Sequence, residues 1–195
     1  MLNPRATNDD LTAKARIRNA AMDLFSQYGE SRVSMRAVAA EADVTLGLVQ
    51  HHFKTKAGLI AAVDQLVVDY FAAAVASVPL TGTPGENVAA RNEAVRIMLR
   101  DNPAVVNYVR RAILEPAETQ MRLLEALIEL TRREVGNLRE AGQASTARRE
   151  STQIVDVLVG QFGELLLAPM IDAVWERVAG AGDTAKPRLS ITVRD

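Results

Sequence analysis

The stretch that decides the fold is SMRAVAAEADVTLGLVQHHFKTK, residues 34–56. Ser34 and Thr45 are residue types suited to the N-cap of a helix, and each precedes a short segment with helical apolar spacing, MRAVAAEA and LGLVQHHF. Asp43, which tolerates a left-handed backbone better than most residues, lies in the turn between the two segments. Two short helices joined by a tight turn predict a helix-turn-helix.

The second of these helices has two distinct faces. Val49 and Phe53 are four residues apart, so they lie on one face and can pack inward. The opposite face and the end of the helix carry polar, basic and small apolar side chains, namely Thr45, Leu46, Leu48, His51, His52, Lys54 and Lys56. Such a face could enter a DNA major groove, with the basic end and the free N–H groups after Thr55 placed near phosphates.

The rest of the chain also reads as helical. Aromatic residues are only 4% of the sequence, and strand signals are nearly absent. A first helix is expected from about Asp9 to Tyr28, ended by Gly29, with one apolar stripe made of Ile17, Ala20, Ala21, Leu24, Phe25 and Tyr28. A long helix at 56–76 carries its own stripe (Leu59, Val63, Leu66, Tyr70), and three further helices are expected at roughly 86–101, 103–115 and 117–141.

Residues 147–179 are apolar on more than one helical face. One stripe, Ile154, Leu158, Phe162 and Leu165, is expected to face the core. The other is expected to meet a second subunit, and its candidate dimer-interface residues are Val155, Val159, Gly163, Leu166 and Met170. The alternative is one deeply buried helix within a monomer. Pro169 is expected to kink or split the region, and the tail at 181–195 is expected to be loose.

Composition narrows the class of protein. The sequence has no cysteine, which excludes disulfide frameworks and thiol catalysis, and its N-terminus has no apolar segment typical of a signal peptide. Apolar runs such as VLVGQFGELLLAPM are interrupted by Gln161 and Glu164, so no membrane span is expected. The first 60 residues carry a net charge of +2 and the remainder −3, a weak indication of a polyanion-facing N-terminal part. A soluble, cytoplasmic protein is expected.

Residues 14–63 resemble the DNA-binding domain of the TetR family of transcriptional regulators. The matching elements are AAMDLF followed by Gly29, then Ser34 and VAAEADV, then Gly47, His52–Phe53, Lys56 and Leu59. The resemblance implies an all-helical protein of about nine helices. Its N-terminal three-helix DNA-binding domain would span residues 9–55. A ligand-binding and dimerisation domain would span 56–180, with helix 56–76 connecting the two.

The same resemblance assigns roles to single residues. Arg36 matches a position that can reach a base, Thr45, Leu46 and Leu48 match the base-facing edge, and Gln50, His51, His52 and Lys56 match backbone-contacting positions. The complete predicted DNA-binding set is Ser34, Arg36, Thr45, Leu46, Gly47, Leu48, Gln50, His51, His52, Lys54 and Lys56. The family usually has an aromatic residue at the position of Gln50 and glycine at that of Asp43. A solvated surface arginine at position 36 and a packed histidine at position 52 are the alternatives.

The resemblance further implies a homodimer that binds a palindromic operator, more often as a repressor, and is released by a small-molecule effector. Candidate effector-binding residues are Tyr70, Met98, Tyr108, Met121, Phe162 and Trp175, each of which could instead belong to the core. An adaptor that has lost DNA binding is the second hypothesis, favoured by Gln50 and the modest charge. No cofactor is expected. An enzyme is disfavoured because catalytic motifs such as GxSxG and HExxH are absent. A metal site at His51–His52 is disfavoured because adjacent helical residues diverge by ~100°.

Overall fold

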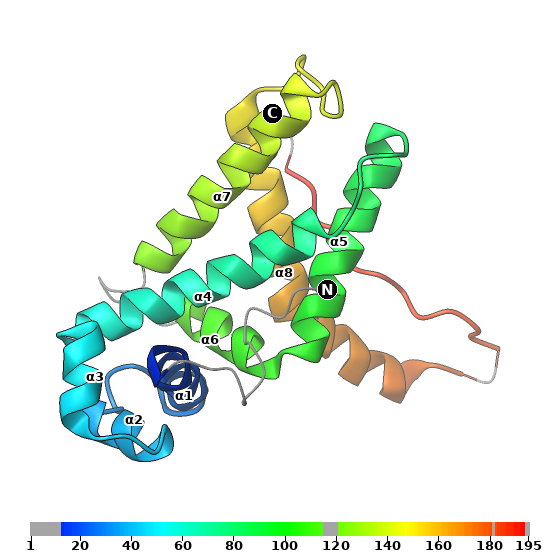
Figure 1. Ribbon diagram of the computed structural model, residues 1–195. Helices are drawn as coiled ribbons and strands as arrows, with labels where there is room; N and C mark the ends of the chain where they lie inside the picture. Colours follow the sequence, from blue (N-terminus) through cyan, green and yellow to red (C-terminus); the bar gives the residue numbers. More distant parts are fainter. Residues whose placement is uncertain (1–12, 115–120, 181, 194–195) are drawn as a thin grey trace. The chain divides into compact units, whose positions relative to one another are not determined.

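The computed structural model describes residues 13–114, 121–180 and 182–193 of the chain. Every regular element within them is an α-helix, so the predicted all-α fold class is confirmed. The helices are α1 (Ala13–Tyr28), α2 (Met35–Glu41), α3 (Leu46–Phe53), α4 (Lys56–Ala76), α5 (Pro84–Asp101), α6 (Pro103–Leu114), α7 (Met121–Glu140) and α8 (Glu150–Val178), shown in Figure 1. The described part has eight helices rather than about nine, since α8 runs on through Pro169.

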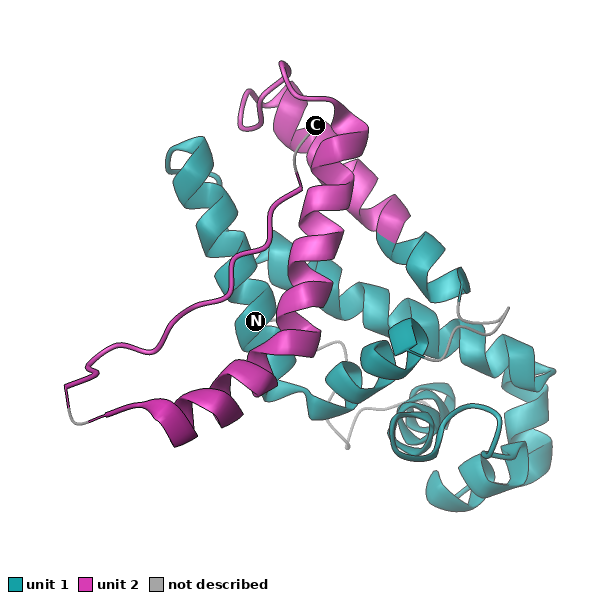
Figure 2. Cartoon of the chain, turned by 180° about the vertical axis from the view of Figure 1, so that it is seen from behind, with its two compact units in different colours: residues 1–127 teal, residues 128–195 magenta. Residues whose placement is uncertain are grey.

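The chain divides into two compact units, residues 1–127 and residues 128–195, coloured separately in Figure 2. The first unit holds α1 to α6 and the start of α7, and the second holds the remainder of α7, α8 and the segment after it. The predicted division between residues 55 and 56 concerns function, namely DNA binding before it and ligand binding and dimerisation after it. It does not describe the compact units, and it stays a prediction. Residues 9–12, with which the first predicted domain begins, lie outside the described residues.

Side-chain caps define where the central helices begin. Ser34, Thr45 and Thr55 each accept a hydrogen bond from the backbone N–H three residues later, at 3.1, 3.2 and 3.1 Å. Ser34 and Thr45 are the N-caps that the sequence predicts, and Thr55 caps α4 in the same way. Gly29, with φ of +83°, ends α1 as predicted, because glycine adopts this left-handed conformation without a steric penalty.

The first unit is organised around α4. The residues of its predicted apolar stripe, Leu59, Val63, Leu66 and Tyr70, are all buried. This helix packs against α1, α3 and α5, so it is covered on several sides. Its start is therefore fixed next to α3 while its remaining length lies in the core of the unit.

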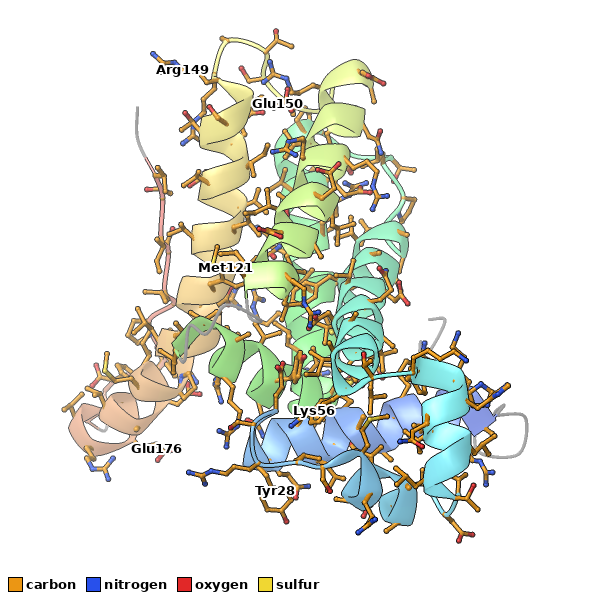
Figure 3. The ribbon with its side chains drawn as sticks, turned by 90° about the vertical axis from the view of Figure 1, so that its left-hand side faces the viewer. Tyr28, Lys56, Met121, Arg149, Glu150 and Glu176 are labelled. Atoms are coloured by element: carbon orange, nitrogen blue, oxygen red, sulfur yellow. The ribbon has the colours of Figure 1, made fainter. Side chains whose placement is uncertain are left out.

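One part of the predicted α1 stripe is wrong. Tyr28 is 54% exposed, and Met22, which the stripe omitted, is fully buried. Helix α1 contacts α2, α3, α4 and α6, so it is buried on more than one face and a single stripe underestimates its core residues. Tyr28 stands in the last turn, next to solvent, and is labelled in Figure 3.

In the second unit, α8 buries one side and exposes the other. Ile154, Leu158 and Leu165 of the predicted inner stripe are buried, and Phe162 is half-buried. The helix changes direction in its C-terminal part (Figure 2), the part that contains Pro169. Proline cannot donate the backbone hydrogen bond of the helix interior, so a bend is expected there.

Two helices, α4 and α8, are long and apolar enough to cross a membrane by length and composition alone. The sequence-based expectation of no membrane span depends on the interruptions at Gln161 and Glu164, but α8, with 29 residues, passes the test despite them. In α4, 56% of the apolar window is buried within the protein, against 11% in α8. Helices of soluble proteins pass the same test, so the finding is weak support for a membrane location.

Candidate nucleic-acid interface

The turn between α2 and α3 is closed by a pair of backbone hydrogen bonds. The N–H of Val44 donates to the carbonyl of Ala39 at 3.0 Å, and the N–H of Asp43 donates to that of Ala40 at 3.2 Å. Together they form a Schellman motif, which needs a left-handed residue at the position after the C-cap. Asp43 fills that position with φ of +52°. The predicted tight turn is thus present, and Asp43 adopts there a conformation that favours glycine.

Helix α3 presents the faces that the sequence predicts. Val49 and Phe53 are buried against the rest of the unit. Four predicted contact residues, Thr45, Gly47, Gln50 and His51, are exposed, while Leu46, Leu48 and His52 are half-buried. The outward face of α3 therefore offers small, polar and short apolar side chains to a partner.

Gly47 lies on that outward face, and the packing of the protein does not require glycine at this position. A Cβ added there would meet only Thr45 Oγ1, at 3.9 Å, which is an ordinary contact. Glycine in a helix costs roughly 1 kcal/mol relative to alanine. A glycine that packing does not require is consistent with a partner that must approach the backbone closely.

The two histidines pack against their neighbours in the helix. The rings of His51 and His52 meet edge to face, with centroids 5.3 Å apart and an interplanar angle of 76°. His52 also lies edge-on to Phe53, at 6.3 Å. His52 is half-buried, in agreement with a packed histidine, whereas His51 is exposed and open to a partner.

The connection from α3 to α4 is unusually tight. Lys54 has φ of +62° and ψ of −58°, and the N–H of Thr55 donates to the carbonyl of Phe53 at 2.7 Å. This is a γ-turn with positive φ, a rare and strained conformation for a residue with a side chain. Lys54 is exposed, so the turn holds a cation at the surface next to α3.

This turn requires glycine at position 58, which the sequence did not reveal. A Cβ at Gly58 would overlap the carbonyl oxygen of Phe53, a backbone atom that cannot swing aside. Only glycine lets the first turn of α4 come so close to the end of α3. The signal that could have found it is a glycine in the first turn of a long helix, where alanine is otherwise preferred.

Arg36 and Lys56 lie on either side of α3 in the sequence. Arg36 is exposed on α2, and Ser34 uses its hydroxyl to cap that helix. Lys56, labelled in Figure 3, is half-buried at the start of α4, and its ammonium group donates to the carbonyl of Ser31 at 3.5 Å. Lys56 thus helps to hold the loop before α2, while Arg36 is available to a partner.

Two hydrogen bonds from Arg111, here called the Arg111 clasp, join α6 to the end of α1. Arg111 donates from Nε to the carbonyl of Ser26 at 3.1 Å and from Nη2 to that of Gln27 at 2.8 Å. The last carbonyls of a helix carry partial negative charge and lack partners within the helix, so a guanidinium suits them well. Arg111 therefore serves the fold by joining α6 to the end of α1.

A buried polar cluster links three helices and the loop before α2. The hydroxyl of Tyr108 lies 2.8 Å from Asp64 Oδ1 and 2.8 Å from Glu30 Oε1. On the other side of Asp64, Arg122 Nη2 lies 3.4 Å from Oδ2. Burial, with Asp64 only 6% exposed, raises the pKa of this carboxyl to about 6, against the lowering influence of Tyr108 and Arg122.

The hydroxyl of Tyr108 has one hydrogen but faces two carboxyl groups. Burial, together with the adjacent Asp64 and Glu30, raises the pKa of Tyr108, so this hydrogen stays in place. The hydroxyl donates toward Asp64 Oδ1 and Glu30 Oε1, so the two carboxyl groups share its one hydrogen. The cluster therefore ties α4 and α6 to the loop that leads into α2.

The predicted effector-binding residues are divided between the two units. Tyr70, Met98 and Tyr108 are buried in the first unit, and Met121 is exposed there. The other two, Phe162 and Trp175, are half-buried residues of the second unit. Tyr108 is already engaged with two carboxyl groups. The effector set remains a prediction.

The predicted dimer residues all lie on α8. Val155, Val159 and Met170 are exposed large apolar side chains, whereas Gly163 and Leu166 are half-buried. Leu167, Val174 and Val178 add further exposed apolar surface on the same helix. The dimer set also remains a prediction.

Known proteins are similar to this chain at two levels. Residues 17–63 match the sequence model of a family described as bacterial regulatory proteins, tetR family. A 60-residue segment is 48% identical to the HTH-type transcriptional regulatory protein RaaS of Mycobacterium tuberculosis. That segment covers 31% of this chain and 28% of RaaS, so the chain matches less than a third of the curated relative's length.

Solved structures match over most of the chain. A transcriptional regulator from Rhodococcus sp. Rha1 has a TM-score of 0.64 with 23% identity, covering 84% of this chain and 87% of its own. The multidrug binding protein EbrR, solved with imidazole, has a TM-score of 0.62 with 23% identity, covering 94% of this chain and 100% of its own. At such identities the likeness establishes the fold alone.

Proposed function

We propose that this chain, whose residues 17–63 match the sequence model of the tetR family of bacterial regulatory proteins, is a DNA-binding transcription regulator whose activity responds to a small molecule. It binds a palindromic operator as a homodimer, acts as a repressor, and is released from the operator by its effector. The family consists of non-enzymatic DNA-binding proteins. The protein works in the cytoplasm, where the operator is.

The observation that carries this proposal is the outward face of α3. Val49 and Phe53 fasten the helix from inside, so its exposed residues are held in fixed positions. Thr45 and Gly47 are exposed at the start of α3. In a recognition helix, the residues at the N-terminal end are the ones that contact base edges. Leu46 and Leu48 are apolar and suit thymine methyl groups rather than hydrogen-bonding edges.

Two exposed cations flank α3 in the sequence, Arg36 on α2 and Lys54 in the turn after α3. Lys54 supplies a phosphate contact. Arg36 is the only long cationic side chain in the predicted set that precedes α3, so base contact in the groove falls to it. Gln50 and His51 are exposed and can donate hydrogen bonds to the sugar-phosphate backbone.

A dimer is needed because one helix of this length contacts few base pairs. Two copies of α3 in successive major grooves would lie ~34–36 Å apart, or a multiple of that distance. The exposed apolar residues of α8, including Val155, Val159 and Met170, favour this helix as the dimer surface. Its predicted interface residues Gly163 and Leu166 lie on the same helix.

The effector response is proposed to pass through α4 and α6. The Arg111 clasp and the Tyr108 cluster connect α6 with α1 and with the loop before α2. A ligand that moves α6 would therefore disturb the DNA-binding helices directly. EbrR, whose printed name is a multidrug binding protein, shares this fold, which supports a small-molecule effector here as well. The effector is apolar or aromatic, in keeping with the candidates Tyr70, Met98, Met121, Phe162 and Trp175.

Selection of the purified protein against a random duplex DNA library at moderate salt tests the proposal. Enrichment of a palindrome with half-sites about one helical turn or more apart is the expected result. The selected duplex then serves as a probe for effectors that release the protein. No enrichment from a folded dimer would contradict DNA binding.

The second candidate function, an adaptor that has kept the fold and lost DNA binding, is favoured by one observation. Gln50 is exposed where relatives of this kind usually place an aromatic residue, so stacking on the sugar-phosphate surface is lost. The two candidates differ in the salt dependence of DNA affinity. A specific reader loses affinity steeply as salt rises, whereas an adaptor shows only background binding.

A further inference from the structure

The segment after α8 carries a pattern of its own. Residues 189–193 read LSITV, an alternation of apolar and polar side chains. In the structure Leu189, Ile191 and Val193 are half-buried, and Ser190 and Thr192 are exposed. The segment is extended and turns one face toward the protein, although the sequence predicts a loose tail.

The end of this segment is held by an ion pair on the second unit. Arg148 Nη1 lies 2.9 Å from Asp156 Oδ2, and the other oxygen of Asp156 accepts a 2.7 Å hydrogen bond from the N–H of Val193. Arg148 also donates to the carbonyl of Val193. In an extended strand the N–H and C=O of one residue point to the same edge. The ion pair thus offers Val193 the donor and acceptor that a neighbouring strand would offer.

The middle of the segment lies against the glycines of α8. A Cβ added at Gly163 would overlap Ile191 Cδ1, and one added at Gly160 would be 3.7 Å from the carbonyl oxygen of Ile191. Lys186 forms an ion pair with Asp172. The segment therefore runs back along α8 and is attached at three successive places, as the extended trace beside α8 in Figure 2 illustrates.

The face that the segment covers overlaps the face proposed for the dimer at Gly163. Gly163 lies three residues after Gly160 and four after Val159, and both of these lie three or four residues after Asp156, so the four share one side of α8. Val159 on this side remains 41% exposed beside the docked segment. At Gly163, where a second helix could approach most closely, Ile191 already fills the space.

We propose that residues 189–193 are a built-in competitor for the outward face of α8: docked there, they occupy the surface that a second copy of the chain would use. The segment is held by three half-buried side chains and one half-buried ion pair, so it can detach from α8. Self-association through α8 then requires the segment to detach. This inference rests on the dimer of the proposed function.

The test compares the full-length protein with two charge-matched variants, Ile191→Asp and Thr192→Asp. The first places a charge against Gly163, and the second places the same charge on the exposed side of the segment. The rate of tryptic cleavage after Arg188 reports detachment, and sedimentation velocity over a dilution series reports dimer dissociation. We expect Ile191→Asp to speed cleavage and lower the dimer dissociation constant, each by roughly five- to tenfold or more. Thr192→Asp is expected to behave as the unchanged protein.

A second pair of variants removes the effect of charge. Gly163→Ala displaces Ile191, whereas Gly160→Ala meets only an ordinary contact, so faster cleavage is expected in the first alone. Equal dimer strength in Ile191→Asp and Thr192→Asp overturns the proposal, as does a weaker dimer in Ile191→Asp. A chain that stays monomeric in every form contradicts the dimer of the proposed function and the competitor with it. Dimers of equal strength contradict only the competitor.

Discussion

The hydroxyl of Tyr108 in α6 lies 2.8 Å from the carboxyl of Asp64 in α4, deep in the unit that carries the helix-turn-helix. The same hydroxyl reaches Glu30 in the loop before α2. A buried carboxyl with a pKa near 6 is unusual in a helix otherwise lined by apolar side chains. Its protonation therefore contributes to the stability of this unit in a way that depends on pH.

The free energy of unfolding should fall as pH rises from about 4 to above 6. The pKa of Asp64 is about 6 in the folded chain and 3.8 as the ordinary value, so the folded state binds more protons in this interval. The favourable contribution is complete below the ordinary pKa and lost as pH rises through the folded pKa. The difference corresponds to about 3 kcal/mol at most.

Asp64→Asn should flatten this pH dependence, because an amide keeps the acceptor for Tyr108 and does not ionise. Urea unfolding followed by circular dichroism at pH 4.5, 5.5 and 7.5 measures it. Asp69→Asn, on the same helix but half-buried, is the matched control and should retain the slope of the unchanged protein. Equal slopes in the two variants would show that Asp64 is not the group responsible.

Gly58→Ala should destabilise the protein by about 1–3 kcal/mol, because its methyl group would overlap the carbonyl oxygen of Phe53. Gly85→Ala in α5 meets no atom within 4 Å and should be neutral or stabilising. Thermal and urea unfolding of the two variants give the comparison. If Gly58→Ala were as stable as Gly85→Ala, the α3–α4 turn would have more room than the structure gives it.

Lys54→Gly should gain stability and lose DNA affinity. Glycine relieves the positive φ at the turn, a strain of about 1–3 kcal/mol, but removes a cation. Lys54→Ala removes the same charge and keeps the strain, so it separates the two effects. Both variants should reduce the slope of log affinity against log salt by about 1, as expected for one phosphate contact. An unchanged slope would place Lys54 away from the phosphates.

Gly47→Ala should leave the fold intact and weaken operator binding. The new methyl group has room within the protein, and alanine favours the helix by up to about 1 kcal/mol. The same methyl group would stand between α3 and DNA. Unfolding experiments and DNA titration on one preparation measure both quantities. Full affinity in a stable Gly47→Ala variant would mean that DNA does not approach this backbone.

Arg36→Ala should cost about 1–3 kcal/mol of operator binding and relax the sequence preference at one base pair. Substitution of Lys54, in contrast, should lower the affinity for all DNA sequences alike. Repeated selection from a random library with the variant shows which position of the palindrome becomes degenerate. Arg132→Ala in α7, an exposed arginine paired with Glu129, is the control. A uniform loss of affinity in Arg36→Ala would make it a phosphate contact.

Local features of the sequence predicted this fold well, and long-range contacts account for what was missed. The caps at Ser34, Thr45 and Thr55 and the stop at Gly29 depend on residues a few positions apart, so they could be read directly. The faces of α3 follow from helical periodicity in the same way. The all-helical fold class needed no more than this.

Contacts between distant residues could not be anticipated. Asp64 reads as a polar residue on a helix until Tyr108 and Arg122 are brought to it, and Arg111 reads as a surface charge until α6 meets the end of α1. Tyr28 fits the apolar spacing of α1, but its side chain is exposed. The docked segment was missed because its partner, Gly163, lies on a separate element.

The two-residue connection between α3 and α4 has a mechanical consequence. With only Lys54 and Thr55 between them, and Gly58 in close approach, α3 is joined almost rigidly to the start of α4. Helix α4 has 21 residues and is therefore about 30 Å long. Tilting such a lever by about 5° around its far end displaces its start by about 2.6 Å, a large fraction of the 3.4 Å rise of one base pair. In the proposed dimer two such levers would add their displacements, so a change too small to disturb the core would take both copies of α3 out of register with the proposed operator.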